Sequence, residues 1–143
     1  MEYRRSAHSV YDLRYHIVFC TKYRYRVLCG DIAVRCREII REVCTANYID
    51  IISGNIGPDH VHMLISVPPH ISVSNAVQYI KGKSSRKLQQ EFEKLKKRYW
   101  GQHMWSRGYF AVTTGALNSE DVQRYIERQE EHHKVDNFRI SEF

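Results

Sequence analysis

Two histidines separated by one residue, His60 and His62, stand in an apolar run that ends at Pro68. Side chains two residues apart on a strand point to the same face, so the two imidazoles would stand side by side. Paired imidazoles on a rigid strand are a good beginning of a metal site. Downstream, Tyr125 and Gln129 place a hydroxyl and a carboxamide on one face of a predicted helix. Together these four residues indicate an enzyme that uses a metal ion and a tyrosine nucleophile.

Length and composition favour an ordinary globular protein with one domain over residues 1–143, of which 43% are hydrophobic and 27% charged. The net charge of +6 is only a weak indication of a polyanionic partner. The four cysteines show no CxxC spacing, and no signal peptide or membrane span is recognisable. We therefore expect a cytoplasmic protein with reduced thiols and no membrane association.

The periodicity of apolar residues predicts seven elements in the order β-α-β-β-α-β-α. Asp31 and Ser72 or Ser74 are plausible N-caps of the first two helices. The order is that of an α+β, ferredoxin-like or RRM-like βαββαβ fold with an antiparallel sheet, helices on one face and an extra C-terminal helix. The expected strands are 12–20, 48–56, 60–67 and 108–114, the expected helices are 31–44, 72–99 and 118–132, the core covers about 10–133, and 134–143 is a polar tail.

The two faces of the predicted His strand have different roles. Val61, Met63 and Ile65 alternate with the histidines and are apolar, so they are expected to face the helices. His60 and His62 then face away from the helices, on the open face of the sheet. His16 lies on a neighbouring strand and would share that face, whereas the other histidines are expected to be surface or structural residues.

The motifs together resemble those of a known enzyme family. The run PDHVHMLI that contains His60 and His62 resembles the His-hydrophobic-His signature of HUH-type nucleases. The helix with Tyr125 and Gln129, the stretch KGKSSR and the stretch WSRGYF extend this likeness to the small single-tyrosine transposases of bacterial and archaeal insertion sequences. The resemblance covers about residues 10–133, with the motifs in the order of the family.

This resemblance implies a DNA transposase that cleaves and rejoins single-stranded DNA at hairpin-marked element ends. His60, His62 and Gln129 would hold Mg²⁺ or Mn²⁺, although histidine ligands by themselves would favour zinc or another transition ion. Tyr125, on the extra C-terminal helix, would attack the scissile phosphate and form a 5′-phosphotyrosine intermediate. The family also implies a homodimer in which the tyrosine helix of one subunit completes the site of the other.

Basic residues near aromatic ones are candidates for DNA contacts. The segment KYRYR interleaves Lys22 and Arg24 with tyrosines, a pattern that suits phosphates and unstacked bases, although a solvated basic loop has the same composition. Lys83 and Arg86 on the long helix are candidates for the backbone of a hairpin, as is Arg107 in the loop that precedes the last strand.

Three alternatives share parts of this pattern. An RRM-like module that binds nucleic acid without catalysis would need aromatic side chains on its exposed central strands, where this chain has His60 and His62. An HUH enzyme of the replication-initiator type, or one associated with palindromic repeats, would usually be larger. A decayed transposase would keep the fold without activity, and the intact Tyr125 and Gln129 argue against it.

Overall fold

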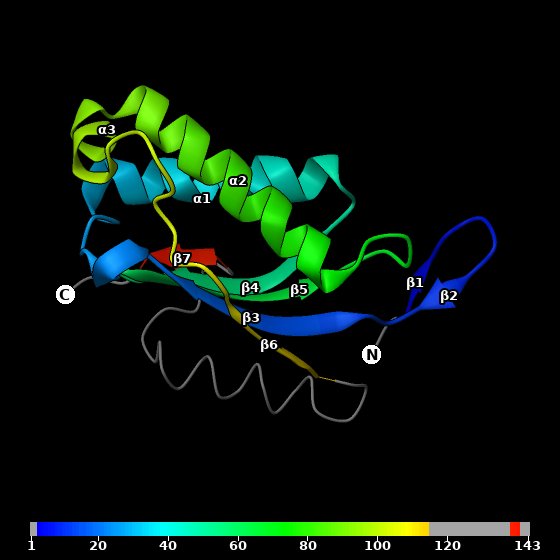
Figure 1. Cartoon of the computed structure of the whole chain (residues 1–143). Coiled ribbons are helices and arrows are strands. Elements are labelled where there is room, and N and C mark those ends of the chain that lie inside the picture. The colour runs from blue at the N-terminus through cyan, green and yellow to red at the C-terminus, as the bar shows by residue number, and fades with distance from the viewer. Residues whose placement is uncertain (1–2, 115–137, 141–143) are drawn as a thin grey trace.

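A computed structural model of the chain describes residues 3–114 and 138–140. The sheet is built from β3 (Arg14–Cys20), β4 (Asp50–Ile56), β5 (His60–Ser66), β6 (Phe110–Thr113) and β7 (Phe138–Ile140). Its order is β6-β3-β5-β4-β7, and every pairing except that of β4 with β7 is antiparallel (Figure 1). The first four of these strands have the order of a ferredoxin-like βαββαβ fold, so the predicted α+β class is confirmed.

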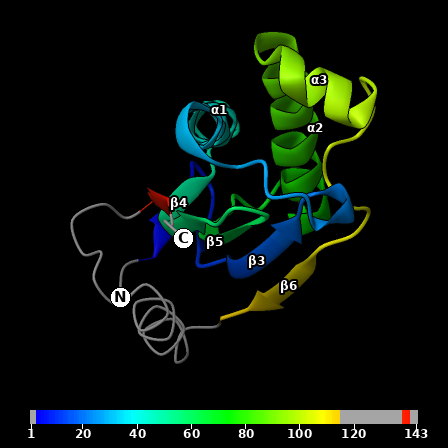
Figure 2. The same ribbon diagram turned by 90° about the vertical axis from the view of Figure 1, so that its left-hand side faces the viewer.

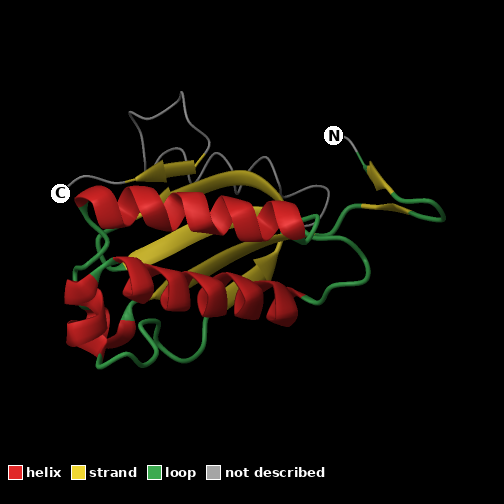
Figure 3. Cartoon of the chain, turned by 90° about the horizontal axis from the view of Figure 1, so that it is seen from above, coloured by secondary structure: helices red, strands yellow, loops and turns green. Residues whose placement is uncertain are grey.

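Helices cover one face of this sheet (Figures 2 and 3). α1 (Gly30–Ala46) and α2 (Val73–Glu91) run across it, and α3 (Glu93–Tyr99) follows at the end of α2. A small hairpin of β1 (Arg4–Arg5) and β2 (Val10–Tyr11) stands beside the sheet. Among the described residues, no helix combines the length and apolar character that a membrane span requires.

The hydrophobic core lies between the sheet and the helices. Val61, Met63 and Ile65 of β5 are fully buried on this side, as the alternation along the strand predicted. Burying one such side chain contributes about 1.5–3 kcal/mol, so the orientation of β5 is strongly fixed, and its histidines must face away from the helices. α1 and α2 contribute the largest share of the opposing surface, with Ile32, Cys36, Ile39, Ile40, Val43, Ala76, Val77, Ile80 and Leu88.

The long helix expected over 72–99 is interrupted, and this part of the prediction is wrong. Ser72 caps α2 as expected, because its side chain accepts a hydrogen bond from the Asn75 amide at 3.0 Å. Phe92, however, is extended, with φ −123° and ψ 101°. Phe92 and Leu95 both pack against the core, so the break does not change which side chains of this segment are buried. The start of α1 also differs: it begins at Gly30, with Cys29 rather than Asp31 in the cap position.

The C-terminal segment is not only a polar tail, because residues 138–140 add β7 to the sheet. Phe138 is fully buried in the core, and its ring lies over Gly54 of β4, where an added Cβ would come within 2.6 Å of the ring. The absence of a side chain at Gly54 therefore makes room for Phe138. The expectation of a purely antiparallel sheet is corrected at the same place, since β7 runs parallel to β4.

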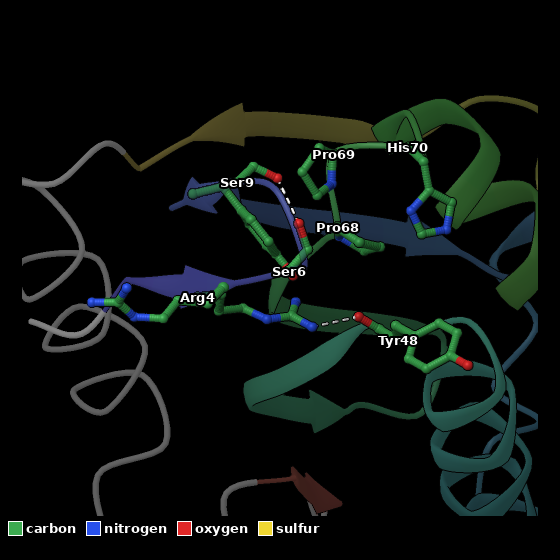
Figure 4. A pocket seen from close by; sticks show the side chains of 9 residues that line it. Arg4, Ser6, Ser9, Tyr48, Pro68, Pro69 and His70 are labelled. Carbon is green, nitrogen blue, oxygen red and sulfur yellow. Dashed lines mark hydrogen bonds between the residues drawn. The ribbon is translucent and has the colours of Figure 1, made fainter.

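Arg4 ties the N-terminal hairpin to the sheet. Its guanidinium donates to the carbonyl oxygens of Ser66 and Tyr48, at 2.9 and 2.8 Å, and lies 3.2 Å from the carboxylate of Asp50. Beside these contacts is an open hollow of about 460 Å³ that Pro68, Pro69 and His70 help to line (Figure 4). The hollow lies at the Ser66 end of β5, away from His60 at the start of the strand.

Candidate active site

His60 and His62 lie next to each other on the face of the sheet opposite the described helices, since their neighbours Val61 and Met63 are buried on the helix side. Their ring centroids are 4.8 Å apart, and the ring planes are tilted by 46°. The side chain of His60 is 27% exposed, so at least one imidazole is accessible from this face. The arrangement expected from the sequence, two imidazoles side by side on a strand, is therefore present.

Asp59 fixes the orientation of the His60 ring. Its Oδ1 lies 2.7 Å from Nδ1 of His60, and its Oδ2 accepts a hydrogen bond from Nε of Arg24 at 3.1 Å. Partial burial alone would raise the pKa of Asp59, but the hydrogen bonds from His60 and Arg24 outweigh this and hold the pKa below its usual range. A charged Asp59 keeps the proton of His60 on Nδ1, which leaves Nε2 free to bind a metal ion. Sequence reasoning did not single out Asp59.

Replacing Asp59 by asparagine is expected to weaken metal binding by about 10–100-fold, because the carboxylate that orients His60 is lost. The volume of the side chain is kept, so the free energy of unfolding should change much less. Titration calorimetry with Mn²⁺ on the wild type and on Asp59→Asn measures the effect. Equal affinities for the two proteins would show that Asp59 does not act on the site.

Gly57, the first residue of the turn between β4 and β5, leaves the space that the His60 ring occupies. A Cβ at this position would lie 2.5 Å from Cε1 and 2.8 Å from Nε2 of His60. The Gly57 amide also donates to the His60 carbonyl at 2.8 Å, so the backbone itself cannot easily move away. The predicted turn thus does more than connect two strands, since it makes room for the ring.

Gly57→Ala is expected to push the His60 ring by about 1 Å, since ordinary contacts begin near 3.5 Å. A displacement of that size at a catalytic group costs up to about a hundredfold in rate. Gly82→Ala is the control for an added methyl group, because nothing lies within 4 Å of an added Cβ there. Gly82 lines the groove with Lys83 and Arg86, so the rates are compared for the bound complexes. The test compares the DNA-cleavage rates of the two variants. If Gly57→Ala cleaved as fast as Gly82→Ala, the His60 ring would tolerate the added methyl group.

His62 is held in its neutral form. Burial, followed by the charges of His60 and His16, lowers the pKa of His62 to about 4. A neutral imidazole is the form that binds metal ions. His16 approaches His62 edge-on at 5.9 Å, so it shares the face as expected. Burial lowers the pKa of His16 as well, and its buried Nε2 has no hydrogen-bond partner among the described residues.

The described residues therefore fit one side of a metal site. They supply two imidazoles, one of them oriented by a carboxylate, but no cluster of three or more His, Cys, Asp or Glu side chains within 3–114 and 138–140 could enclose an ion. A metal ion bound to the two histidines would need further ligands from outside this part of the chain. The predicted third ligand Gln129 and the predicted nucleophile Tyr125 lie outside the described residues, as does the expected helix at 118–132.

Two of the predicted DNA contacts, Lys22 and Arg24, lie next to the histidines. They belong to a short 3-10 helix (Lys22–Arg24) that follows β3, and the last residue of β3, Cys20, pairs with His60. Tyr23 and Arg24 have positive φ angles of 64° and 55°, a rare conformation for residues with side chains. The Arg24 side chain is 63% exposed while it bonds to Asp59. It therefore presents a cation at the edge of the His60 site.

Aromatic side chains continue this basic surface onto the end of α3. Tyr25 packs against Tyr23 and Tyr99, with centroids 5.4 and 5.7 Å apart, and the guanidinium of Arg98 lies 4.0 Å from the Tyr25 ring centroid. Trp100, at the end of α3, is 86% exposed. Sequence reasoning treated the end of this helix as a solvated charged run. It did not single out Tyr99 and Trp100, although two adjacent aromatic residues are visible in the sequence.

Arg107 lies in a loop that is bound to the same end of the sheet. The amide of Ser106 donates to the Cys20 carbonyl at 2.8 Å, and its hydroxyl donates to the Thr21 carbonyl at 3.0 Å. The ammonium of Lys81 donates to the carbonyl oxygens of Ser106 and Gly108 at 2.8 and 2.9 Å. Lys81 thus holds the loop beside Arg107, and burial lowers its pKa.

Lys83 and Arg86 are not near the histidines. Both line an open groove between α1 and α2, together with the exposed Tyr79. Since the helices cover the face opposite His60 and His62, this groove lies on the other side of the sheet (Figure 2). The structure therefore divides the predicted DNA contacts between two surfaces: Lys22, Arg24 and Arg107 at one end of the sheet, Lys83 and Arg86 on the helices.

The family model for IS200-like transposases matches residues 9–129. The chain belongs to this family. The ISDra2 transposase TnpA of Deinococcus radiodurans is 33% identical to this IS200-like transposase over 129 residues, which cover 90% of this chain and 92% of that protein. The transposase for insertion sequence element IS200 of Salmonella typhimurium is 38% identical over 129 residues, which cover 90% of this chain and 84% of that protein.

Solved structures agree with this assignment. A crystal structure of a transposase from Deinococcus radiodurans superposes with a TM-score of 0.72 at 32% identity and covers 88% of this chain and 97% of that one. A tyrosine transposase solved with a REP hairpin superposes with a TM-score of 0.60 at 16% identity. The match covers 94% of this chain and 76% of that one, and it shows that the two proteins have the same fold. The IS200-like transposases are DNA-cleaving and strand-transferring enzymes, which decides against a module that only binds nucleic acid. The matched range includes Tyr125 and Gln129.

Proposed function

We propose that this IS200-like transposase cleaves and rejoins single-stranded DNA at hairpin-marked element ends, through a metal-assisted attack by Tyr125. The observation that carries the proposal is the pair His60 and His62 on one face of β5, with Asp59 orienting His60. Two adjacent imidazoles, one of them oriented by a carboxylate, next to a basic and aromatic surface suit phosphoryl transfer better than simple binding. The active unit is the single domain of residues 1–143, acting in the cytoplasm.

His60, His62 and Gln129 would hold the metal ion, for which Mg²⁺ or Mn²⁺ is proposed from the resemblance to the family. When bound, the ion would stabilise the negative charge that gathers on the phosphate oxygens during attack. Asp59 keeps Nε2 of His60 available, and the low pKa of His62 keeps that ring neutral. These properties belong to the chain itself and prepare the site for a cation.

In the proposed reaction the oxygen of Tyr125 forms a bond to the scissile phosphorus, while the bond from phosphorus to the 3′-oxygen breaks. The phenolic proton is lost and the leaving oxygen gains one, so the products are a 5′-phosphotyrosine link and a free 3′-hydroxyl. A later attack by a 3′-hydroxyl on this link rejoins the strand and restores the tyrosine. One phosphodiester replaces another, so no external energy source is needed.

The two basic surfaces suggest how the DNA would lie. The single strand would pass the end of the sheet, where Lys22, Arg24 and Arg107 meet phosphates and exposed rings such as Tyr23 stack on bases. The duplex of the hairpin would contact the groove with Lys83 and Arg86. A protein of the same fold was solved with a REP hairpin, so the fold is compatible with such a ligand.

We further propose a homodimer with active sites assembled in trans. The described residues supply only the two-histidine part of the site, so the element that carries Tyr125 and Gln129 must complete it. In the family, that helix comes from the partner subunit. Mixing a Tyr125→Phe protein with a His62→Ala protein tests this arrangement, because activity returns in the mixture only if the two halves come from different subunits.

The proposed function is tested with a labelled single-stranded oligonucleotide that carries an element-end hairpin, with Mg²⁺ or Mn²⁺. We expect a protein–DNA adduct that survives denaturing electrophoresis, requires the metal ion, does not form on fully duplex DNA and is absent in Tyr125→Phe. Tight binding of the strand without an adduct, with either ion, would contradict the proposal.

A further inference from the structure

β7 brings Arg139 onto the same face of the sheet as the two histidines. In the register of the strands, Arg139 pairs with Asn55 of β4, and Asn55 pairs with His62 of β5. The three residues therefore form one row across the sheet. Neighbouring strands are spaced by about 4.8 Å, so the Cα atoms of Arg139 and His62 are roughly 10 Å apart. A long arginine side chain can cover much of that distance.

The direction of Arg139 follows from its neighbour. Phe138 is fully buried in the core between sheet and helices, against Gly54. Successive side chains of a strand point to opposite faces, so Arg139 points to the face of His62. Arg139 lies ten residues beyond the end of the family match at residue 129, and neither the motifs nor the resemblance assigns it a role.

One nitrogen of Arg139 has no hydrogen-bond partner in the part of the chain that the structure describes. Its Nη1 is buried, and no acceptor among the described residues bonds to it. His16 Nε2 and Ser53 Oγ, on the same side of the sheet, are also buried without a partner there. A buried guanidinium N–H without an acceptor is unfavourable, and an anion that accepts its hydrogen bond removes this cost. An anion on the face of the sheet that carries His60 and His62 would supply the acceptor that this guanidinium needs.

We propose that Arg139 binds a backbone phosphate of the single DNA strand held over His60 and His62. The inference rests on the proposed function, since it assumes that this strand crosses the His face. A guanidinium suits a phosphate because its planar N–H groups match two phosphate oxygens. β7 is then a functional strand: it uses Phe138 to anchor itself in the core and Arg139 to reach the substrate.

The test measures binding of a short single-stranded oligonucleotide at several salt concentrations. Each phosphate contact on a single strand contributes about 0.7 to the slope of log K against log salt, so Arg139→Gln should lower the slope by about 0.7. Arg139→Lys keeps the charge and should keep the slope. Arg139→Met, which retains an apolar stem, is a second neutral variant should the glutamine variant not fold. Arg5→Gln removes the same charge from the exposed hairpin and serves as the control with an unchanged slope.

A purely structural arginine would change stability without changing the salt slope. If the wild type forms the Tyr125 adduct but the neutral Arg139 variants keep the wild-type slope, this inference is overturned while the proposed function stands. If the wild type forms no adduct at all, the proposed function fails first, and this inference fails with it.

Discussion

Replacing His62 by alanine is expected to lower the rate of adduct formation by at least about a thousandfold, which corresponds to about 4 kcal/mol of transition-state stabilisation. The reason is the loss of one of two imidazoles from a site to which the described residues contribute no third ligand of comparable kind. The proposed DNA-binding surface with Lys22 and Arg24 remains, so affinity for the strand should change by less than about threefold. Single-turnover rates and binding constants, measured on the same oligonucleotide, separate these two effects.

His70→Ala is the matched control for this experiment. His70 is exposed beside the hollow at the other end of β5, and its removal should leave the rate unchanged. The account would be contradicted if His62→Ala weakened binding of the strand while the bound complex still reacted at the wild-type rate. His62 would then be a DNA contact instead of a metal ligand.

Replacing Trp105 by alanine is expected to have the largest effect on stability, about 3–5 kcal/mol in the free energy of unfolding. The side chain is 4% exposed, meets the Phe19 ring edge-on at 4.8 Å, and donates through Nε1 to the Ser84 hydroxyl at 2.9 Å. Its backbone also bridges to Thr21. Trp105 therefore fixes the loop that carries Arg107 to the end of β3. Urea unfolding monitored by circular dichroism measures the loss.

Ser84→Ala separates the hydrogen bond from the packing. This variant leaves the Trp105 ring in place but removes its acceptor, which should cost about 1–3 kcal/mol because a buried N–H is then unpaired. If both variants destabilised the protein equally, packing against Phe19 would contribute nothing measurable. Such a result would contradict the present account of the loop.

The central part of the fold was predictable from the sequence because burial patterns determine it. The alternation around Val61 and Met63 predicted a strand with one apolar face, and that face also placed His60 and His62 on the other side. The order of elements then predicted the ferredoxin-like sheet. Each of these features depends on many residues, so one residue that departs from the pattern does not change the predicted strand or sheet.

Features that depend on one or two residues were missed. β7 has only three residues, too few to show a period, and it forms because Gly54 leaves space for Phe138. The interruption at Phe92 has no counterpart in the apolar pattern, since Phe92 and Leu95 are spaced as on one face of a continuous helix. The formation of β7 is a tertiary effect, which a local pattern of three residues cannot reveal.

The candidate site shows the same division. The spacing of His60 and His62 was informative, whereas the hydrogen bond that Asp59 accepts from His60 depends on a rotamer and a turn that spacing does not reveal. The separation of Lys83 and Arg86 from the other basic residues follows from the arrangement of layers, which charge alone cannot predict. Tyr125 and Gln129 remain predictions from sequence and family.

The most direct test of the central claim is to identify the residue that carries the DNA. The wild-type adduct, formed with Mg²⁺ on a single-stranded oligonucleotide, is denatured, digested with trypsin and analysed by mass spectrometry. We predict a 5′-phosphate linked to Tyr125, in the peptide that contains that residue, and no linked peptide when the metal ion is chelated. A linkage to any other residue, or an adduct that forms equally well in Tyr125→Phe, would contradict the account.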